Sequence, residues 1–219
     1  MTYNARLAQG AFSTINEENF TAICDELAGR DHDLAQIIRQ YHYPPLWKRP
    51  PGFETLVHII LEQQVSLASA LAALHKIKAV LGNQFTPSAF LALSDDTLRA
   101  CYFSRQKTIY TRHLANAIIN GTLVPDAFGQ MEDAEVRAQL VKIKGIGQWT
   151  ADVYLMMVLQ RPDLFPSGDI ALMTSIREVK NLSLDTPRDT ILLIASRWQP
   201  YRTVATFLLW HAYLSKRKK

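Results

Sequence analysis

Cysteine is almost absent from this chain, which has only Cys24 and Cys101 among its 219 residues. Two thiols so far apart predict unpaired core residues and exclude a small fold stapled by disulfides. No apolar run reaches the roughly eighteen residues that a membrane helix needs, so we expect no membrane span. The first residues lack the apolar core of a signal peptide, which predicts a cytoplasmic protein, nucleoid-associated if bacterial.

Alternating strand patterns are also lacking. Apolar residues instead recur at three- and four-residue steps, which is typical of amphipathic helices. Four prolines within residues 43–52 prevent a helix there and predict a linker. The chain is therefore predicted to be all-α, with helices at residues 17–27, 33–41, 53–63, 66–81, 87–93, 95–101, 107–120, 133–143, 148–160, 170–179, 187–197 and 201–216.

A strong net charge is missing as well. The formal charge is +4 and the sequence pI is about 9.1, which is compatible with a nucleic-acid partner without requiring one. The six histidines show no metal-ligand spacing.

Residues 140–175 form the most informative stretch. A predicted helix stops at Gly145-Ile146-Gly147, because glycine tolerates the positive φ of a sharp reversal. A second helix starts at Gln148, and a loop at residues 161–168 leads to Asp169 at the start of another helix. A glycine hairpin that opens a helix exposes N–H groups at the positive end of the helix dipole, which attracts phosphate. A hairpin that is purely structural is the alternative.

Residues 145–151 and 165–169 resemble the hairpin and the catalytic loop of the helix-hairpin-helix base-excision DNA glycosylases, in particular of the DNA-3-methyladenine glycosylase II branch. The resemblance extends from about Trp47 to about Tyr213. It implies an all-α, two-lobed helical glycosylase fold, with the helix-hairpin-helix motif at the cleft between the lobes.

The resemblance also implies where the lobes lie. Residues 1–51 and 161–219 are expected to form one helical lobe. Residues 52–160 are expected to form the other, with the helix-hairpin-helix motif at about 134–160. Some relatives carry clustered cysteines near the C-terminus for an iron–sulfur cluster, and this chain has none after Cys101, so that cluster is excluded.

Asp169 matches the family's catalytic aspartate. Its carboxylate would stabilise the positive charge that develops on deoxyribose as the N-glycosidic bond breaks. The alternative is an acid that only caps a helix. Trp149 stands where relatives that also cleave the DNA backbone have a nucleophilic lysine, which implies attack by water and no lyase activity. Lys142 and Lys144 do not match that position.

Aromatic residues are the candidates for the base pocket, where a flipped base is held by stacking and a cationic base gains a cation–π attraction. Trp149 and Trp210 match family pocket positions, and Tyr154 is a further candidate. Core tryptophans are the alternative. Val153 replaces an aromatic that can occur in relatives.

Further residues are expected to contact DNA. Gln64 is the candidate wedge that fills the gap left by a flipped nucleotide, although a polar plug departs from the apolar one of some relatives. Ser66 follows it and would also cap a helix, and Lys107 is either a phosphate contact or part of a solvated face. The resemblance adds the hairpin residues Gly145, Gly147, Gln148 and Thr150.

No cofactor is expected to be required. The resemblance implies a structural Na⁺ or K⁺ held by the backbone carbonyls of Val141, Ile143 and Ile146.

The sequence therefore predicts a monofunctional DNA glycosylase in base excision repair, which removes alkylated purines such as 3-methyladenine and 7-methylguanine. The expected partner is double-stranded DNA with alkylated bases, and the expected state is a monomer. Two alternatives stay open: a glycosylase of the same fold for neutral lesions (hypoxanthine, ethenoadenine, oxidised bases), and a non-enzymatic DNA-damage binding protein. A binding protein needs no carboxylate like that of Asp169.

Overall fold

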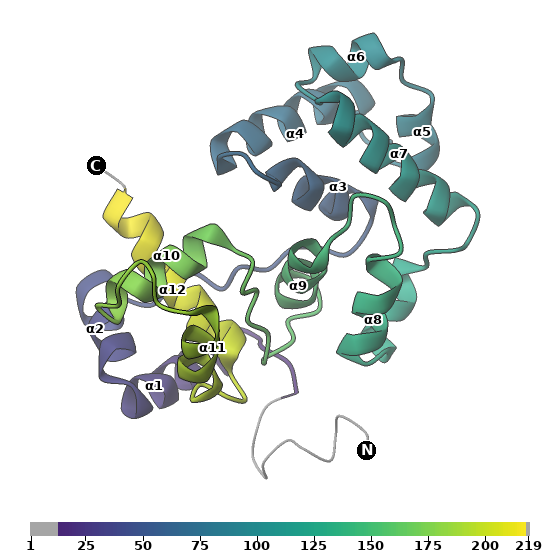
Figure 1. The fold of residues 1–219 in the computed structure, drawn as a ribbon. Helices are drawn as coiled ribbons and strands as arrows, with labels where there is room; N and C mark the ends of the chain where they lie inside the picture. Colours follow the sequence, from purple (N-terminus) through teal and green to yellow (C-terminus); the bar gives the residue numbers. More distant parts are fainter. Residues whose placement is uncertain (1–12, 218–219) are drawn as a thin grey trace. The chain divides into compact units, whose positions relative to one another are not determined.

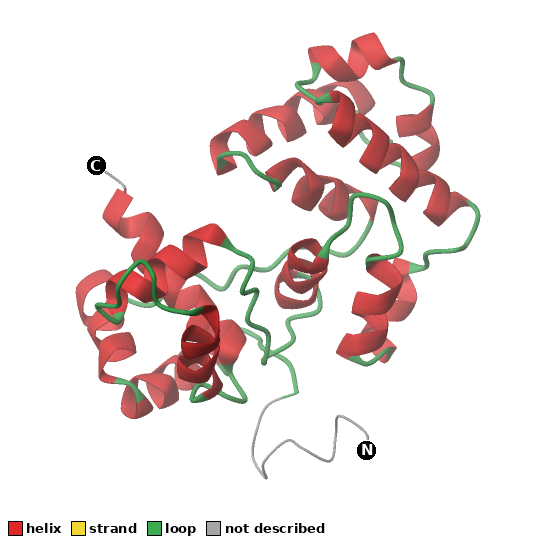
Figure 2. Cartoon of the chain, viewed as in Figure 1, coloured by secondary structure: helices red, strands yellow, loops and turns green. Residues whose placement is uncertain are grey.

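The computed structural model describes residues 13–217 and divides the chain into two compact units. Unit 1 comprises residues 1–48 and 155–219, and unit 2 comprises residues 49–154. Among the described residues every regular element is helical, as Figure 2 shows. The all-α prediction is confirmed.

Both unit boundaries fall earlier in the chain than residues 51/52 and 160/161, where we expected them. Arg49 is held in unit 2, because its guanidinium pairs with the Glu62 carboxylate at 2.7 Å. Gln160 is held in unit 1, because its side-chain amide donates to the carbonyl of Trp47 at 3.0 Å.

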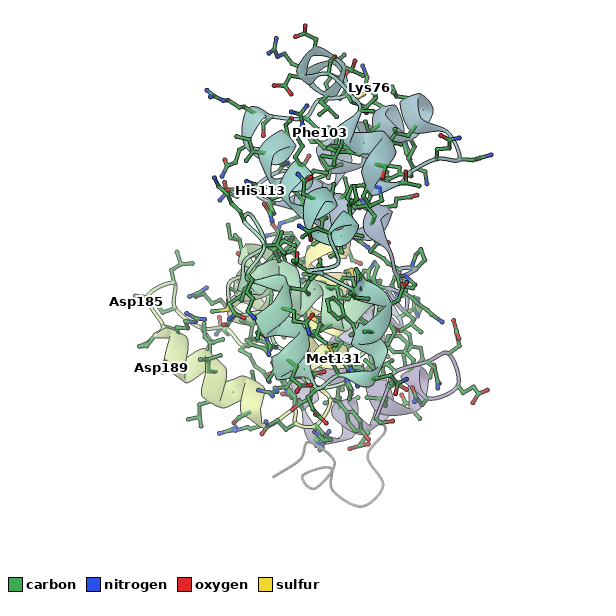
Figure 3. The ribbon with its side chains drawn as sticks, turned by 90° about the vertical axis from the view of Figure 1, so that its right-hand side faces the viewer. Lys76, Phe103, His113, Met131, Asp185 and Asp189 are labelled. Atoms are coloured by element: carbon green, nitrogen blue, oxygen red, sulfur yellow. The ribbon has the colours of Figure 1, made fainter. Side chains whose placement is uncertain are left out.

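Unit 1 is built around the long helix α12 (Arg202–Arg217). This helix is apolar on nearly all sides between residues 203 and 212, and such a helix is buried. Asp185, in the loop before helix α11 (Arg188–Ser196), and Asp189, in its first turn, project outward (Figure 3). Helix α12 contacts α1 (Phe20–Arg30), α2 (His32–Tyr41) and α10 (Ile170–Val179), and α11 (Arg188–Ser196) precedes it (Figure 1).

Unit 2 contains the remaining helices. Helix α3 (Phe53–Glu62) packs against both α4 (Leu67–Leu81) and α7 (Arg105–Ile119). Helix α7 also contacts the short helices α5 (Pro87–Leu91) and α6 (Asp95–Ala100) (Figure 1). A 3₁₀ helix, η2 (Pro125–Gln130), precedes α8 (Asp133–Leu140) and α9 (Gln148–Met157), and unit 2 ends within α9.

All twelve predicted helices are present, with ends that differ by a few residues. Helix α4, for example, begins one residue after Ser66, because the Ser66 hydroxyl accepts the backbone N–H of Ser69 and caps the helix. The 3₁₀ helix was not predicted, since a single short turn gives no hydrophobic period. Cys24 and Cys101 are buried and unpaired, as expected. Within residues 13–217, no helix has both the length and the apolar character to cross a membrane.

Candidate active site and DNA-contact residues

The glycine hairpin lies between α8 and α9 in unit 2, and its two glycines differ. Gly145 has φ +94°, and a Cβ there would overlap the ring of Tyr110 on α7. Glycine is therefore required at residue 145 by both backbone and packing. Gly147 lies outside the left-handed region, and an added Cβ meets nothing within 4 Å. Our expectation that the turn itself requires glycine at both positions is wrong for Gly147.

Gln63, at the end of α3, holds the hairpin from the other side. Its Nε2 donates to the carbonyl of Gly145 at 2.8 Å and to Oγ1 of Thr150 at 2.9 Å. Thr150 is only 2% exposed. Its hydroxyl is therefore part of the internal support of the hairpin, and a contact of its backbone N–H with DNA stays a prediction.

The turn at residues 63–66 places Gln64 on the surface. Gln64 is exposed and has φ +57°, a backbone conformation that few residues other than glycine adopt. Strained, exposed positions of this kind are enriched at functional sites, and the wedge assignment stays a prediction. Ser66 caps α4 through its hydroxyl, which is the structural role that we had kept as its alternative.

The side chain of Lys107 makes a hydrogen bond within unit 2. Its ammonium donates to the carbonyl of Leu61 at 2.5 Å, and desolvation lowers the pKa of Lys107 below its ordinary value. Because the side chain is half-buried and fastens α7 to the end of α3, it is not part of a freely solvated face. Its contact with phosphate stays a prediction.

The segment before Asp169 is tied to the start of α12 in unit 1. The Asp163 carboxylate accepts two hydrogen bonds from the Arg202 guanidinium, at 2.7 and 2.8 Å. The Thr203 hydroxyl accepts the backbone N–H of Leu164 at 3.0 Å and donates to the Arg161 carbonyl at 2.7 Å. The loop is therefore anchored on the helix that also carries Trp210.

Asp169 is the N-cap of α10, and its carboxylate accepts hydrogen bonds from a backbone N–H and from an indole. Oδ1 accepts the backbone N–H of Leu172 at 2.7 Å and the indole Nε1–H of Trp210 at 3.1 Å. The side chain is partly exposed. Asp169 therefore caps the helix, as its alternative proposed, and its charge is also fixed in position by a helix N-terminus and an indole.

Trp210 lies in an aromatic cluster of unit 1. Its ring stacks on Phe207 at 6.0 Å between centroids and meets the edge of Trp47 at 6.2 Å. It is 9% exposed. The cluster fixes the indole so that its N–H meets Asp169. Contact between Trp210 and a flipped base stays a prediction.

The two remaining pocket candidates lie on α9 and differ in exposure. Trp149, in the first turn, is partly exposed and can face a ligand. Tyr154 is 0% exposed and packs edge-on against Phe128 at 5.8 Å. Desolvation raises the pKa of Tyr154 to about 12. Tyr154 is a core residue of unit 2, so its assignment to the base pocket is wrong.

The carbonyls expected to hold a monovalent cation lie in the turn between α8 and α9. The Ile143 carbonyl accepts the N–H of Ile146 at 2.9 Å, which closes the turn. A carbonyl oxygen has two lone pairs, so this bond leaves room for a cation. The set Val141, Ile143 and Ile146 is therefore compatible with a cation and stays a prediction.

Gln63 and Tyr110 were missed from the sequence. Both lie far from the hairpin along the chain, and a glutamine at a helix end or a tyrosine within a helix carries no signal of its own. The only available indication was the adjacency of Gln63 to the wedge candidate Gln64. Gln148, in contrast, is exposed at the start of α9, where we expected it to contact DNA.

Comparison with known proteins identifies the family of this chain. Residues 57–200 match the model of the HhH-GPD superfamily of base excision DNA repair proteins. A Bacillus subtilis relative, putative DNA-3-methyladenine glycosylase YfjP, is 30% identical over 82% of this chain and 65% of its own length. The chain thus spans less than two thirds of that relative. DNA-3-methyladenine glycosylase 1 of Schizosaccharomyces pombe is 28% identical over 84% of this chain and 83% of its own length.

A solved structure agrees with the sequence matches. The S. pombe 3-methyladenine DNA glycosylase Mag1, in complex with abasic DNA, superposes with a TM-score of 0.80 and 25% identity, and the match covers 86% of this chain and 95% of that one. The family match covers both the glycine hairpin and Asp169. This chain belongs to the HhH-GPD superfamily of base excision DNA repair proteins.

Proposed function

We propose that this chain is a monofunctional DNA glycosylase that hydrolyses the N-glycosidic bond of alkylated purines, with 3-methyladenine and 7-methylguanine as its substrates. The observation that carries the proposal is the Asp169 carboxylate, held by the Leu172 N–H and the Trp210 indole in a member of a base excision family. Relatives named as DNA-3-methyladenine glycosylases support this substrate class. Double-stranded DNA is the proposed partner and a monomer the proposed state.

The chemistry follows from the charge at Asp169. When the glycosidic bond breaks, the base leaves with the bonding electron pair and the sugar becomes cationic. A fixed carboxylate stabilises that cation. A purine alkylated at N3 or N7 already carries positive charge, so it leaves as a neutral base and needs no strong general acid.

Water completes the reaction by adding to the sugar carbon and releasing a proton, which leaves an abasic site. Trp149 has no amine, so the residue at the family's lysine position cannot capture the sugar as a Schiff base. The backbone N–H groups at the start of α9 would bind a DNA phosphate. The carbonyls of Val141, Ile143 and Ile146 would hold Na⁺ or K⁺, which would reinforce the positive potential there.

The test is base release from methylated duplex DNA, with the freed bases separated by chromatography and the strands examined before and after alkali. We expect 3-methyladenine to be released faster than 7-methylguanine. Strands should break only after alkali, and borohydride should trap no covalent adduct. A trapped adduct contradicts the monofunctional assignment, and faster release of hypoxanthine, ethenoadenine or oxidised guanine contradicts the substrate class. A folded protein that binds abasic DNA and releases no base favours the non-enzymatic alternative.

A further inference from the structure

Gln63 connects two segments of unit 2 that are far apart in the sequence. One side-chain amide donates both to the carbonyl of Gly145, the first residue of the glycine turn, and to the hydroxyl of Thr150, in the first turn of α9. The two acceptors flank residues 146–149, so a single group fixes the geometry of the whole reversal. A carboxylate in place of the amide has no N–H to offer either acceptor.

Helix α7 supports the same junction independently. Lys107 donates to the carbonyl of Leu61 near the end of α3, and the ring of Tyr110 lies against Gly145. The end of α3 and the hairpin are thus both held by α7, three residues apart on one helix face. Gln63 closes this arrangement by joining the end of α3 directly to the hairpin.

Gln64 follows Gln63 immediately and is the exposed tip of the turn. Gln64 adopts a φ of +57° although it is not a glycine. Ser66, at the other end of the turn, is the N-cap of α4. The side chain of Gln63 is therefore the direct link that sets the position of Gln64 relative to the hairpin amides, alongside the support from α7.

We propose that Gln63 is a positioning residue that ties the Gln64 turn to the phosphate-binding amides of the hairpin, so that the two engage DNA as one rigid surface. This inference rests on the proposed function, because it takes Gln64 as the wedge and the hairpin as the phosphate site. When the tie is present, misplacing one segment weakens the contact of the other. Without it, only the support from α7 remains, and the two segments influence each other less.

The test is a double-mutant cycle on the affinity for a duplex with a stable abasic analogue. The cycle uses Gln64→Ala and Gly147→Ala, first in the natural chain and then with Gln63→Met, which keeps the side-chain length but removes both donors. We expect the two effects to be coupled by about threefold or more in the natural chain and to be coupled clearly less with Gln63→Met. Gln84→Met, at an exposed glutamine elsewhere in unit 2, is the control and should leave the coupling intact.

A purely structural role for Gln63 lowers thermal stability but does not change the coupling. Coupling that is undiminished with Gln63→Met, or that is absent in the natural chain, overturns the inference. If Gln63→Met does not fold, Thr150→Val removes one acceptor with little change in shape and should reduce the coupling. Base release from methylated DNA by the natural chain, assayed in parallel, reports separately on the proposed function.

Discussion

Helices α9 and α10 begin in opposite ways. The residue before α9 is Gly147, which has no side chain to offer the first N–H groups of the helix. The residue before α10 is Asp169, whose own carboxylate accepts the N–H of Leu172. Both helices present the positive end of a dipole, which favours an anion. In α10 the chain supplies that anion itself and thereby positions a charge, whereas in the proposed function the N-terminus of α9 takes an anion from the ligand.

The supports of the two N-termini differ accordingly. The hairpin before α9 is held by neutral groups, the amide of Gln63 and the ring of Tyr110. The loop before α10 is held by charged and polar bonds to α12, including the pair of Asp163 with Arg202. A phosphate site needs no further negative charge nearby, while a fixed carboxylate benefits from donors around it. In the proposed function, the same helix geometry therefore serves binding in unit 2 and chemistry in unit 1.

The largest expected effect is the loss of catalysis at α10. Asp169→Asn keeps a side-chain oxygen that can cap the helix but removes the charge. Base release should fall by roughly a hundredfold or more, as for other lost electrostatic stabilisers, while affinity for an abasic analogue changes little. Single-turnover kinetics measure the rate of base release, and a binding titration measures the affinity for the abasic analogue. Asp189→Asn, at the exposed start of α11, is the matched control. Undiminished release by Asp169→Asn would falsify its catalytic role.

Gly145→Ala should damage the hairpin itself. Its Cβ overlaps the Tyr110 ring and its φ of +94° disfavours any other residue. We expect a loss of about 2 kcal/mol or more in the free energy of unfolding, together with weaker DNA binding. Urea unfolding measures the first effect. Gly147→Ala is the control and should unfold as the natural chain does, since its Cβ meets open space. Equal destabilisation by both variants would contradict the structural distinction between the two glycines.

Gly147→Asp converts the start of α9 into a copy of the start of α10. An aspartate is a good N-cap, so thermal stability should be unchanged or slightly higher. Its charge would occupy the amides and repel phosphate, so affinity for DNA should fall by about tenfold, a loss of about 1.4 kcal/mol. Fluorescence anisotropy with labelled duplex measures the affinity, and Gly147→Ala separates the effect of size from that of charge. If Gly147→Asp binds DNA as well as the alanine variant, these amides are not the phosphate site.

Trp210→Phe tests the second donor to Asp169. Phenylalanine keeps an aromatic ring beside Phe207 but has no N–H, and the loss of one hydrogen bond costs about 1 kcal/mol. The rate of base release should fall by about fivefold. Trp198→Phe is a matched control, because its indole donates to another carboxylate of unit 1, that of Asp31, at 2.8 Å. It should lower stability and leave the rate unchanged. A Trp210→Phe variant with the natural rate removes this role for the indole.

The helices and the family motifs could be predicted from sequence because they depend on local patterns. The period of the hydrophobic residues predicted each α-helix of the described residues. A glycine hairpin and an aspartate at the start of a helix are recognisable by their spacing. The errors concern long-range contacts. Tyr154 is core because Phe128 packs on it, and Lys107 is not freely solvated because its ammonium reaches the carbonyl of Leu61. Only the folded chain reveals such neighbours, and the same holds for the difference between Gly145 and Gly147.

The smallest expected effect is a difference in acid response between carboxylates of the two units. In unit 1, burial favours a raised pKa for Asp31, but hydrogen bonds from Lys180 and Trp198 outweigh it and lower the pKa below its ordinary value. In unit 2, burial raises the pKa of Asp152, against the hydrogen bond and charge of Arg137. A lowered folded-state pKa gives stability that is lost as pH falls through it. A raised one gives stability on acidification, because the folded state then binds more protons.

The two acids should therefore change the free energy of unfolding in opposite directions between about pH 7 and about pH 3. The measurement is urea unfolding of the natural chain, Asp31→Asn and Asp152→Asn across that range. On acidification, the advantage of the natural chain over Asp31→Asn should shrink. Its stability relative to Asp152→Asn should instead rise, because protonation relieves the buried charge beside α8. If both differences in the free energy of unfolding change in the same direction with pH, the contacts described for Asp31 and Asp152 do not set the pKa values of these two carboxyl groups.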